Sequence, residues 1–170
     1  MNLEQNLNEL LSDLNVFYRK LQNYHWNVTG QDFFQAHSKL EELYNEINEQ
    51  IDEIAEHILI LGEEPLGTLK DYLEKANITE AENKKIKSQE VFQTILKDYK
   101  KLLEKVTEIK EKADEQKEYS TSALMDDYIL DYSKIIWMLK QKDIYCSRSS
   151  YNRVFSYRTI HIRYNCHLLL

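Results

Sequence analysis

Residues 21–73 read LQNYHWNVTGQDFFQAHSKLEELYNEINEQIDEIAEHILILGEEPLGTLKDYL, and their pattern is the most informative about the fold. Apolar residues recur at helical spacing up to YHWNVTG and again from about residue 33. Gly30 lies between the two segments, and glycine commonly follows the end of a helix. The stretch therefore predicts two antiparallel helices joined by a turn near residue 31.

Two histidines lie at equal distances from this turn, His25 before it and His37 after it. An antiparallel hairpin places residues equidistant from its turn side by side. Because imidazole is a common metal ligand, the hairpin predicts two ligands at one end of a metal site.

Three carboxylates share one side of the second helix with His37. At 3.6 residues per turn, Glu41, Asp52 and Glu56 fall within about 100° of arc from His37. Residues 37 and 56, like 41 and 52, are symmetric about one midpoint. Two antiparallel copies of this helix would therefore bring His37 opposite Glu56 and Glu41 opposite Asp52. Mixed imidazole and carboxylate ligation suits iron.

One copy of the helix cannot build this site, because residues 37 and 52 are roughly 22 Å apart along its axis. Spacing alone also leaves ordinary interpretations open. The carboxylates are typical of a solvated acidic face, and a histidine between Tyr24 and Trp26 is typical of a structural residue.

The rest of the chain predicts a single all-α domain. Glycine and proline occur only between residues 30 and 67. The apolar periodicity predicts helices at about 2–28, 33–61, 68–76, 89–116 and 121–142. Thr79 and Glu82 have capping-box spacing, which predicts a helical turn in 79–88. Four long helices with one short helix in the middle connection form a ferritin-like bundle. No histidine follows a Glu by three residues, which excludes the di-iron site built within one bundle.

Composition limits the partners and the compartment. The net charge is −7, which disfavours strong binding to nucleic acid. No stretch approaches the roughly 18 apolar residues of a membrane span. The N-terminus lacks the basic start of a secretory signal. These features favour a cytoplasmic protein without a membrane partner.

The tail after residue 144 has a different composition. Residues 1–144 combine 18 basic with 29 acidic side chains, a net −11, whereas residues 145–170 hold four arginines and no acid, a net +4. Both cysteines also lie there. The tail is interpreted as a nucleic-acid-binding arm, a disordered extension, or a non-native end from a frameshift or lost stop codon. We therefore divide the chain into a bundle domain, 1–143, and a tail of uncertain role, 144–170.

The motifs YHWNVTG, FFQAH, DEIAE and LGEEPLGTL resemble the Dps family, the dodecameric mini-ferritins also called DNA-protection-during-starvation proteins. The resemblance covers about residues 2–142. It implies a ferroxidase whose iron ligands come from two subunits of a homo-dodecamer. The implied ligands are His25, His37, Asp52 and Glu56, with Glu41 as an additional acidic ligand. The family usually has Asp at position 41 and Arg at position 57, where this chain has Glu41 and His57.

The resemblance also implies what the site does. Ferrous iron is oxidised, with hydrogen peroxide favoured over oxygen, and ferric mineral is stored in a hollow shell, which protects against oxidative stress. Trp26, next to His25, is interpreted either as an electron donor or as a packed core aromatic. Asp126, Asp127 and Asp131 are interpreted either as an acidic pore for ion entry or as acids placed near a helix start after the N-caps Ser120 and Thr121.

A second function class is a nucleoid protein that binds and compacts DNA and shields it physically. Family members that bind DNA tightly usually carry Lys-rich termini, and this chain has no lysine before Lys20. DNA binding is therefore possible but not expected to be strong.

Overall fold

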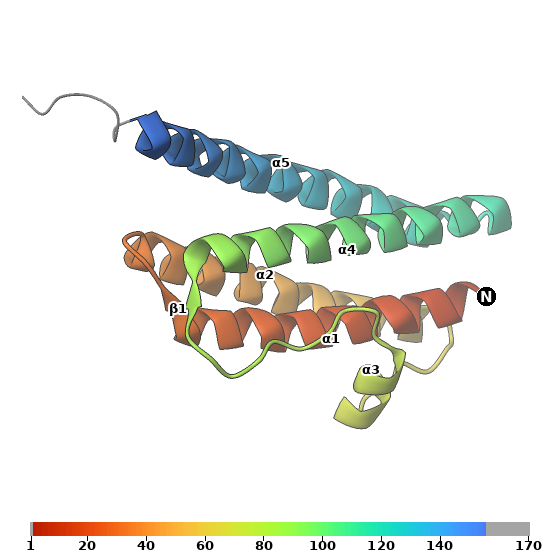
Figure 1. Ribbon diagram of the computed structural model, residues 1–170. Coiled ribbons are helices and arrows are strands. Elements are labelled where there is room, and N and C mark those ends of the chain that lie inside the picture. Colours follow the sequence, from red (N-terminus) through yellow and green to blue (C-terminus); the bar gives the residue numbers. More distant parts are fainter. Residues whose placement is uncertain (1, 156–170) are drawn as a thin grey trace, which may run out of the picture.

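The computed structural model describes residues 2–155, with side chains described for residues 2–141. Five helices and two very short strands follow one another along this part of the chain (Figure 1). Their bounds are α1 (Leu3–Asn27), β1 (Val28–Thr29), α2 (Phe33–Ile60), α3 (Leu69–Lys75), β2 (Ile86–Lys87), α4 (Ser88–Gln116) and α5 (Tyr119–Phe155).

The four long helices form a ferritin-like bundle, and α3 is the short extra helix in the connection between α2 and α4 (Figure 1). This confirms the predicted fold class. The core is a continuous cluster of buried apolar side chains contributed by all four long helices. Within residues 2–155 no helix is long and apolar enough to cross a membrane.

Local chemistry sets where the helices begin and end. Asn2 caps α1 in a capping box with Gln5, because the Asn2 side chain accepts from the Gln5 backbone N–H at 2.8 Å. Thr68 caps α3. At the end of α4, Lys117 adopts a left-handed conformation with φ of 60°, which turns the chain directly into α5.

A short parallel pairing ties the α1–α2 turn to the start of α4. Val28 pairs with Ile86 and Thr29 with Lys87, and Ser88 donates a hydrogen bond to Asp32 at 2.6 Å. Gly30 has φ of +146°, and a Cβ there would lie 3.0 Å from the Asp32 carboxylate. The turn therefore requires glycine both for its backbone angle and for space.

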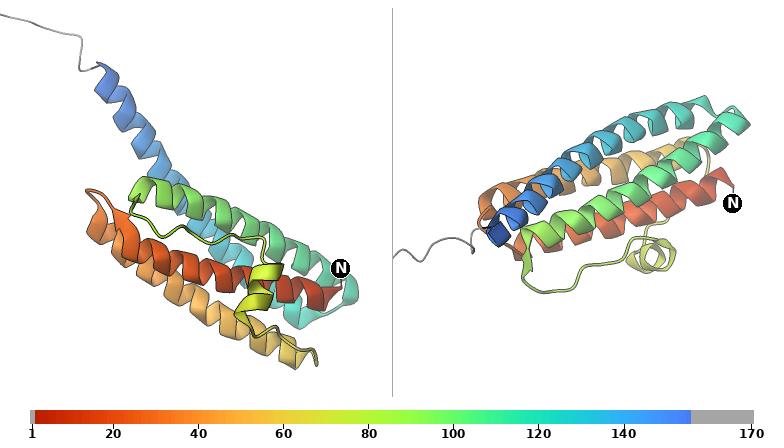
Figure 2. Two further views of the ribbon diagram at one scale, coloured as in Figure 1. Left: turned by 60° about the horizontal axis from the view of Figure 1, so that its bottom comes forward. Right: turned by 45° about the horizontal axis from the view of Figure 1, so that its top comes forward.

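The segment between α3 and α4 is not helical, so the helical turn expected at Thr79 and Glu82 is wrong. This segment runs along the outside of the bundle (Figure 2). Asp13 of α1 holds its beginning, since the buried carboxylate accepts from the backbone N–H groups of Asn77 at 2.5 Å and Ile78 at 2.8 Å. A long-range contact with α1 replaces the local capping that the spacing predicted.

Helix α5 differs from its expected bounds at both ends. It begins at Tyr119, so Ser120 and Thr121 lie inside it and are not N-caps. It continues to Phe155, so residue 143 is not a break in the helix. Towards its C-terminal end α5 diverges from the other helices (Figures 1 and 2). The predictions for the tail concern, from residue 156 to residue 170, a part of the chain outside the described residues.

Candidate metal centre

His25 in the last turn of α1 and His37 in the first turns of α2 are in direct contact. Their rings stack with centroids 3.7 Å apart and planes 20° from parallel. This confirms that the hairpin brings the two histidines together. Tyr44 meets His25 edge-on at 5.4 Å, and Phe33 stacks on His37 at 5.2 Å. Aromatic packing on both sides therefore fixes the orientation of the pair.

Two reciprocal hydrogen bonds fix the tautomers of the pair. The Nδ1 atom of His25 lies 2.9 Å from the backbone carbonyl oxygen of His37, and the Nδ1 atom of His37 lies 2.9 Å from that of His25. A carbonyl oxygen only accepts, so each Nδ1 carries the hydrogen and donates it. In the neutral rings the lone pair is then on Nε2. This is the arrangement of metal-binding histidines, in which the non-ligating nitrogen donates to a fixed acceptor.

The acidic residues of the proposed ligand set lie along α2. Glu41 is the nearest to the histidines in sequence and is linked to them through Tyr44, whose hydroxyl is 3.5 Å from the Glu41 carboxylate. Asp52 and Glu56 lie further along the helix, and all three carboxylates are exposed. Within residues 2–141 no three His, Cys, Asp or Glu side chains converge on a possible metal position. A single subunit thus brings together the two histidines and leaves the carboxylates apart.

His57, one of the two departures from the family pattern, is buried at the contact between α2 and α5. Its Nε2 atom lies 2.8 Å from the hydroxyl of Thr121. Burial lowers the pKa of His57, and the nearby carboxylates of Glu118 and Glu53 offset only part of that effect. His57 is therefore a neutral packing residue at neutral pH, adjacent in sequence to Glu56.

Trp26 is 58% exposed, so its interpretation as a packed core aromatic is wrong. The role of Trp26 as an electron donor stays a prediction.

The three aspartates interpreted as a pore do not share one environment. Asp126 is paired with Lys110 of α4 at 2.9 Å. Asp127 and Asp131 instead line a groove of about 540 Å³ between α2 and α5. We call this the α2–α5 groove. Its side chains are Lys39, Glu46, Glu49, Gln50, Glu53, Tyr99, Leu124, Asp127, Tyr128, Asp131, Lys134, Ile135 and Met138.

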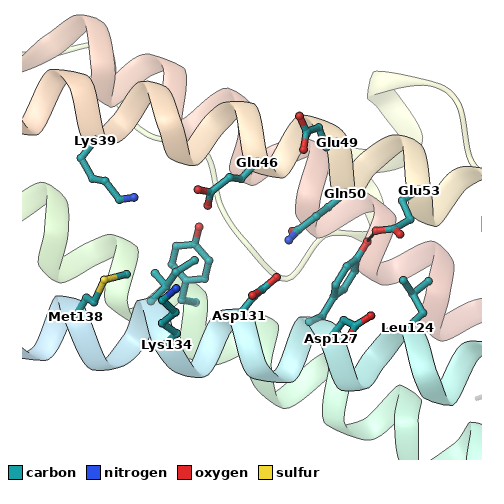
Figure 3. A pocket seen from close by; sticks show the side chains of 13 residues that line it. Lys39, Glu46, Glu49, Gln50, Glu53, Leu124, Asp127, Asp131, Lys134 and Met138 are labelled. Atoms are coloured by element: carbon teal, nitrogen blue, oxygen red, sulfur yellow. Dashed lines mark hydrogen bonds between the residues drawn. The ribbon is translucent and has the colours of Figure 1, made fainter.

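Acidic groups gather in the groove from both helices. Figure 3 shows Gln50 of α2 and Asp131 of α5 extending towards one another, while Glu46 of α2 points along the groove towards Lys39. Sequence reasoning missed the contribution of α2. The available signal was the three- and four-residue spacing of Glu46, Glu49 and Glu53, which puts them on one face of a helix.

The comparisons with known proteins agree with the fold and the motifs. A family model described as "Ferritin-like domain" matches residues 4–143. The chain is 35% identical over 134 residues to the DNA protection during starvation protein of Helicobacter pylori, covering 79% of this chain and 93% of that protein. It is 39% identical to DNA protection during starvation protein 2 of Bacillus anthracis, covering 79% and 91%.

One solved structure is similar to the chain in both fold and sequence. The Dps protein of Vibrio cholerae O1, described as a member of a broad superfamily of ferritin-like diiron-carboxylate proteins, superposes with a TM-score of 0.79 at 39% identity. The match covers 82% of this chain and 87% of that protein. The chain belongs to the Dps family of ferritin-like proteins.

Proposed function

We propose that this protein is a ferroxidase and iron store that oxidises Fe(II) with hydrogen peroxide and holds the ferric product in a hollow shell, which protects the cell against oxidative stress. The observation that carries the proposal is the histidine pair. In both His25 and His37, Nδ1 donates a hydrogen bond to a backbone carbonyl oxygen. The Nε2 lone pairs of the two rings therefore remain available to bind a metal at one end of the bundle.

A second subunit completes the site in this proposal. Two α2 helices packed antiparallel would bring Asp52 and Glu56 of one copy to the histidines of the other. Glu41, on the histidine side, would add a further oxygen ligand. The exposed positions of these carboxylates leave them accessible to a partner.

Exposed apolar side chains at both ends of the α1–α2 hairpin support assembly of subunits. Large apolar residues on a surface commonly mark protein contacts. They are Trp26 and Phe34 near the turn, and Leu59, Ile60, Leu69 and Leu73 at the far end of α2 and on α3. By family resemblance we propose a homo-dodecamer.

The ligand types fit the proposed chemistry, with iron as the substrate. Neutral imidazoles bind the ferrous ion, and carboxylates favour the ferric state because their negative charge offsets the additional positive charge. Each ferrous ion gives up one electron. Hydrogen peroxide takes electrons from two such ions and, with two protons, leaves as water. The acidic α2–α5 groove and the net charge of −7 favour the approach of cations.

Anaerobic titration with Fe(II), with and without hydrogen peroxide, tests the proposal when it is combined with native mass measurement. We expect a dodecameric mass, saturable Fe(II) binding and fast oxidation once peroxide is added. The His37→Ala variant should lose this binding, whereas Glu42→Gln, an exposed carboxylate on α2 that pairs with Lys39, should keep it. Equal Fe(II) binding by His37→Ala and the unmodified protein would refute the site.

A further inference from the structure

Three buried tyrosines form a row beside the α2–α5 groove. Tyr99 of α4 and Tyr132 of α5 have ring centroids 5.5 Å apart, and Tyr132 and Tyr128 have centroids 5.8 Å apart. All three are at most 3% exposed. Tyr99 and Tyr128 also line the groove.

The three hydroxyl groups have different hydrogen-bond partners. The Tyr128 hydroxyl donates to the carboxylate of Glu53 at 2.6 Å, a contact drawn as a dashed line in Figure 3. The Tyr132 hydroxyl donates to the amide oxygen of Gln50 at 2.8 Å. The buried Tyr99 hydroxyl has no hydrogen-bond partner among the side chains of residues 2–141. Among the side chains of residues 2–141, Tyr128 is the tyrosine with a short hydrogen bond to a carboxylate.

This difference makes one of the three tyrosines easier to oxidise than the other two. A phenol that loses an electron becomes strongly acidic and must release its proton to form a stable neutral radical. An amide oxygen is too weak a base to accept that proton, and an unpartnered hydroxyl has no acceptor at all. Glu53 is a carboxylate already in position. Burial and the contact with Glu53 also raise the pKa of Tyr128, so the phenol keeps its proton until it is oxidised.

We propose that Tyr128 and Glu53 form a one-electron donor site that reduces radical oxidants produced near the α2–α5 groove. The oxidant class is the hydroxyl radical, formed when one ferrous ion reduces hydrogen peroxide by a single electron. The electron passes from Tyr128 to the hydroxyl radical, which becomes hydroxide. The Tyr128 O–H bond breaks and its proton moves to Glu53. The products are a neutral tyrosyl radical, a protonated Glu53 and hydroxide, so charge and atoms balance.

The surroundings of Tyr128 favour this step. Carboxylates outnumber lysines in the groove, with five acidic side chains against Lys39 and Lys134, and the resulting negative field lowers the energy needed to remove an electron. The same charges attract ferrous ions, which places the source of the radical close to the donor. This donor site depends on the proposed function in one respect only, namely that ferrous iron and hydrogen peroxide are the source of its oxidant. Glu53 also projects about 100° around α2 from its neighbour Asp52, so the donor is separate from the proposed iron ligands.

Pulse radiolysis of metal-free protein tests the donor without iron. Azide radicals oxidise exposed tryptophans, here Trp137, and the tryptophan radical then oxidises a tyrosine within the same molecule. We expect the tryptophan radical to decay as a tyrosyl radical grows, at a rate independent of protein concentration. Tyr128→Phe should lose most of the tyrosyl signal. Glu53→Gln, which keeps the hydrogen-bond acceptor and removes the base, should slow the transfer several-fold.

Two controls separate the donor from a structural effect. Tyr119→Phe removes an exposed tyrosine at the start of α5 and should leave the transfer unchanged. Heavy water should slow the transfer in the unmodified protein, and this isotope effect should disappear in Glu53→Gln. If Glu53→Gln transfers as fast as the unmodified protein, the donor site is wrong. Fe(II) oxidation is measured separately, so its absence would overturn the proposed function and leave the radical result standing.

Discussion

His25 and His37 constrain each other: the Nδ1 atom of each ring donates to the backbone carbonyl of the other at 2.9 Å, across a turn between two helices. The two rings are therefore oriented before any metal binds. Binding needs no reorganisation of this half of the site, and its affinity depends on whether carboxylates reach it.

Mixing two inactive variants should restore activity if the carboxylates come from another subunit. His37→Ala and Asp52→Ala should each oxidise Fe(II) poorly, because each removes one ligand type from every site. In a mixed dimer, one of the two sites keeps both native residues. Dissociated and reassembled mixtures should then oxidise Fe(II) faster than either variant. Activity no higher than that of the parent variants would show that the ligands do not come from two subunits.

The α2–α5 groove provides a test of ion entry. Asp127→Asn combined with Asp131→Asn should slow Fe(II) uptake by an intact shell, because both carboxylates line the groove. Asp126→Asn is the matched control and should have a smaller effect, since Lys110 already neutralises that side chain. Stopped-flow uptake at low ionic strength, where electrostatic attraction is strongest, measures the difference. Equal rates for all three proteins would exclude a role for the groove.

We expect the folded protein to lose stability in acid because of His57. Burial lowers its pKa in the folded protein below the value of about 6.5 expected for an unfolded chain. Its contribution to stability is therefore present above pH ~6.5 and is lost as the pH falls through the folded-state pKa. His57→Gln keeps a hydrogen-bonding group near Thr121 and does not titrate. Urea unfolding of metal-free protein between about pH 7 and pH 5 should show a smaller loss for His57→Gln. Parallel curves for the two proteins would contradict this assignment.

Lys20 of α1 and Asp98 of α4 form a buried ion pair, and we expect their contributions to the free energy of unfolding to be strongly coupled. Both residues are 4% exposed, and Lys20 Nζ is 2.7 Å from the Asp98 carboxylate. Asp98→Ala should cost about 3–5 kcal/mol, because it leaves a buried charge alone. Replacing both by apolar residues, as in Lys20→Met with Asp98→Leu, should cost much less.

Denaturant unfolding at matched protein concentration measures this coupling. The exposed pair Lys39 and Glu42, 2.8 Å apart, is the control and should couple by only about 0–1 kcal/mol. A coupling energy for Lys20 and Asp98 as small as that of the control would show that the pair is not desolvated in solution.

Truncation after residue 143 should leave assembly and Fe(II) oxidation unchanged. The ferritin-like family model ends at residue 143, and the buried α5 residues Ile136 and Leu139 precede it. The lost residues include both cysteines, so the truncated protein should aggregate less without reductant. Native mass and light scattering compare the two proteins. A monomeric or unfolded truncated protein would show that residues 144–170 contribute to the fold.

The parts of the structure that sequence predicted are those set by local periodicity. Helix α2 was expected at 33–61 and is Phe33–Ile60, and the contact between His25 and His37 follows from their equal distances to one turn. The misses depend on residues distant in sequence. Thr121 contacts His57 instead of capping α5, and Asp13 of α1 replaces the local cap expected at Thr79. Only one side of the α2–α5 groove could be predicted. The spacing of residues shows which of them share a helix face, but it does not show which helix lies opposite that face.

The position of the histidine pair has a consequence for the order of folding. His25 and His37 are separated by 12 residues in one hairpin, whereas the pairing of Val28 with Ile86 closes a loop that contains α2 and α3. Short loops close faster and at lower entropic cost than long ones. We therefore expect the histidine contact to form early, before α4 docks, and the strand pairing to lock it afterwards. Hydrogen exchange pulsed during refolding would then protect the α1–α2 hairpin before the start of α4.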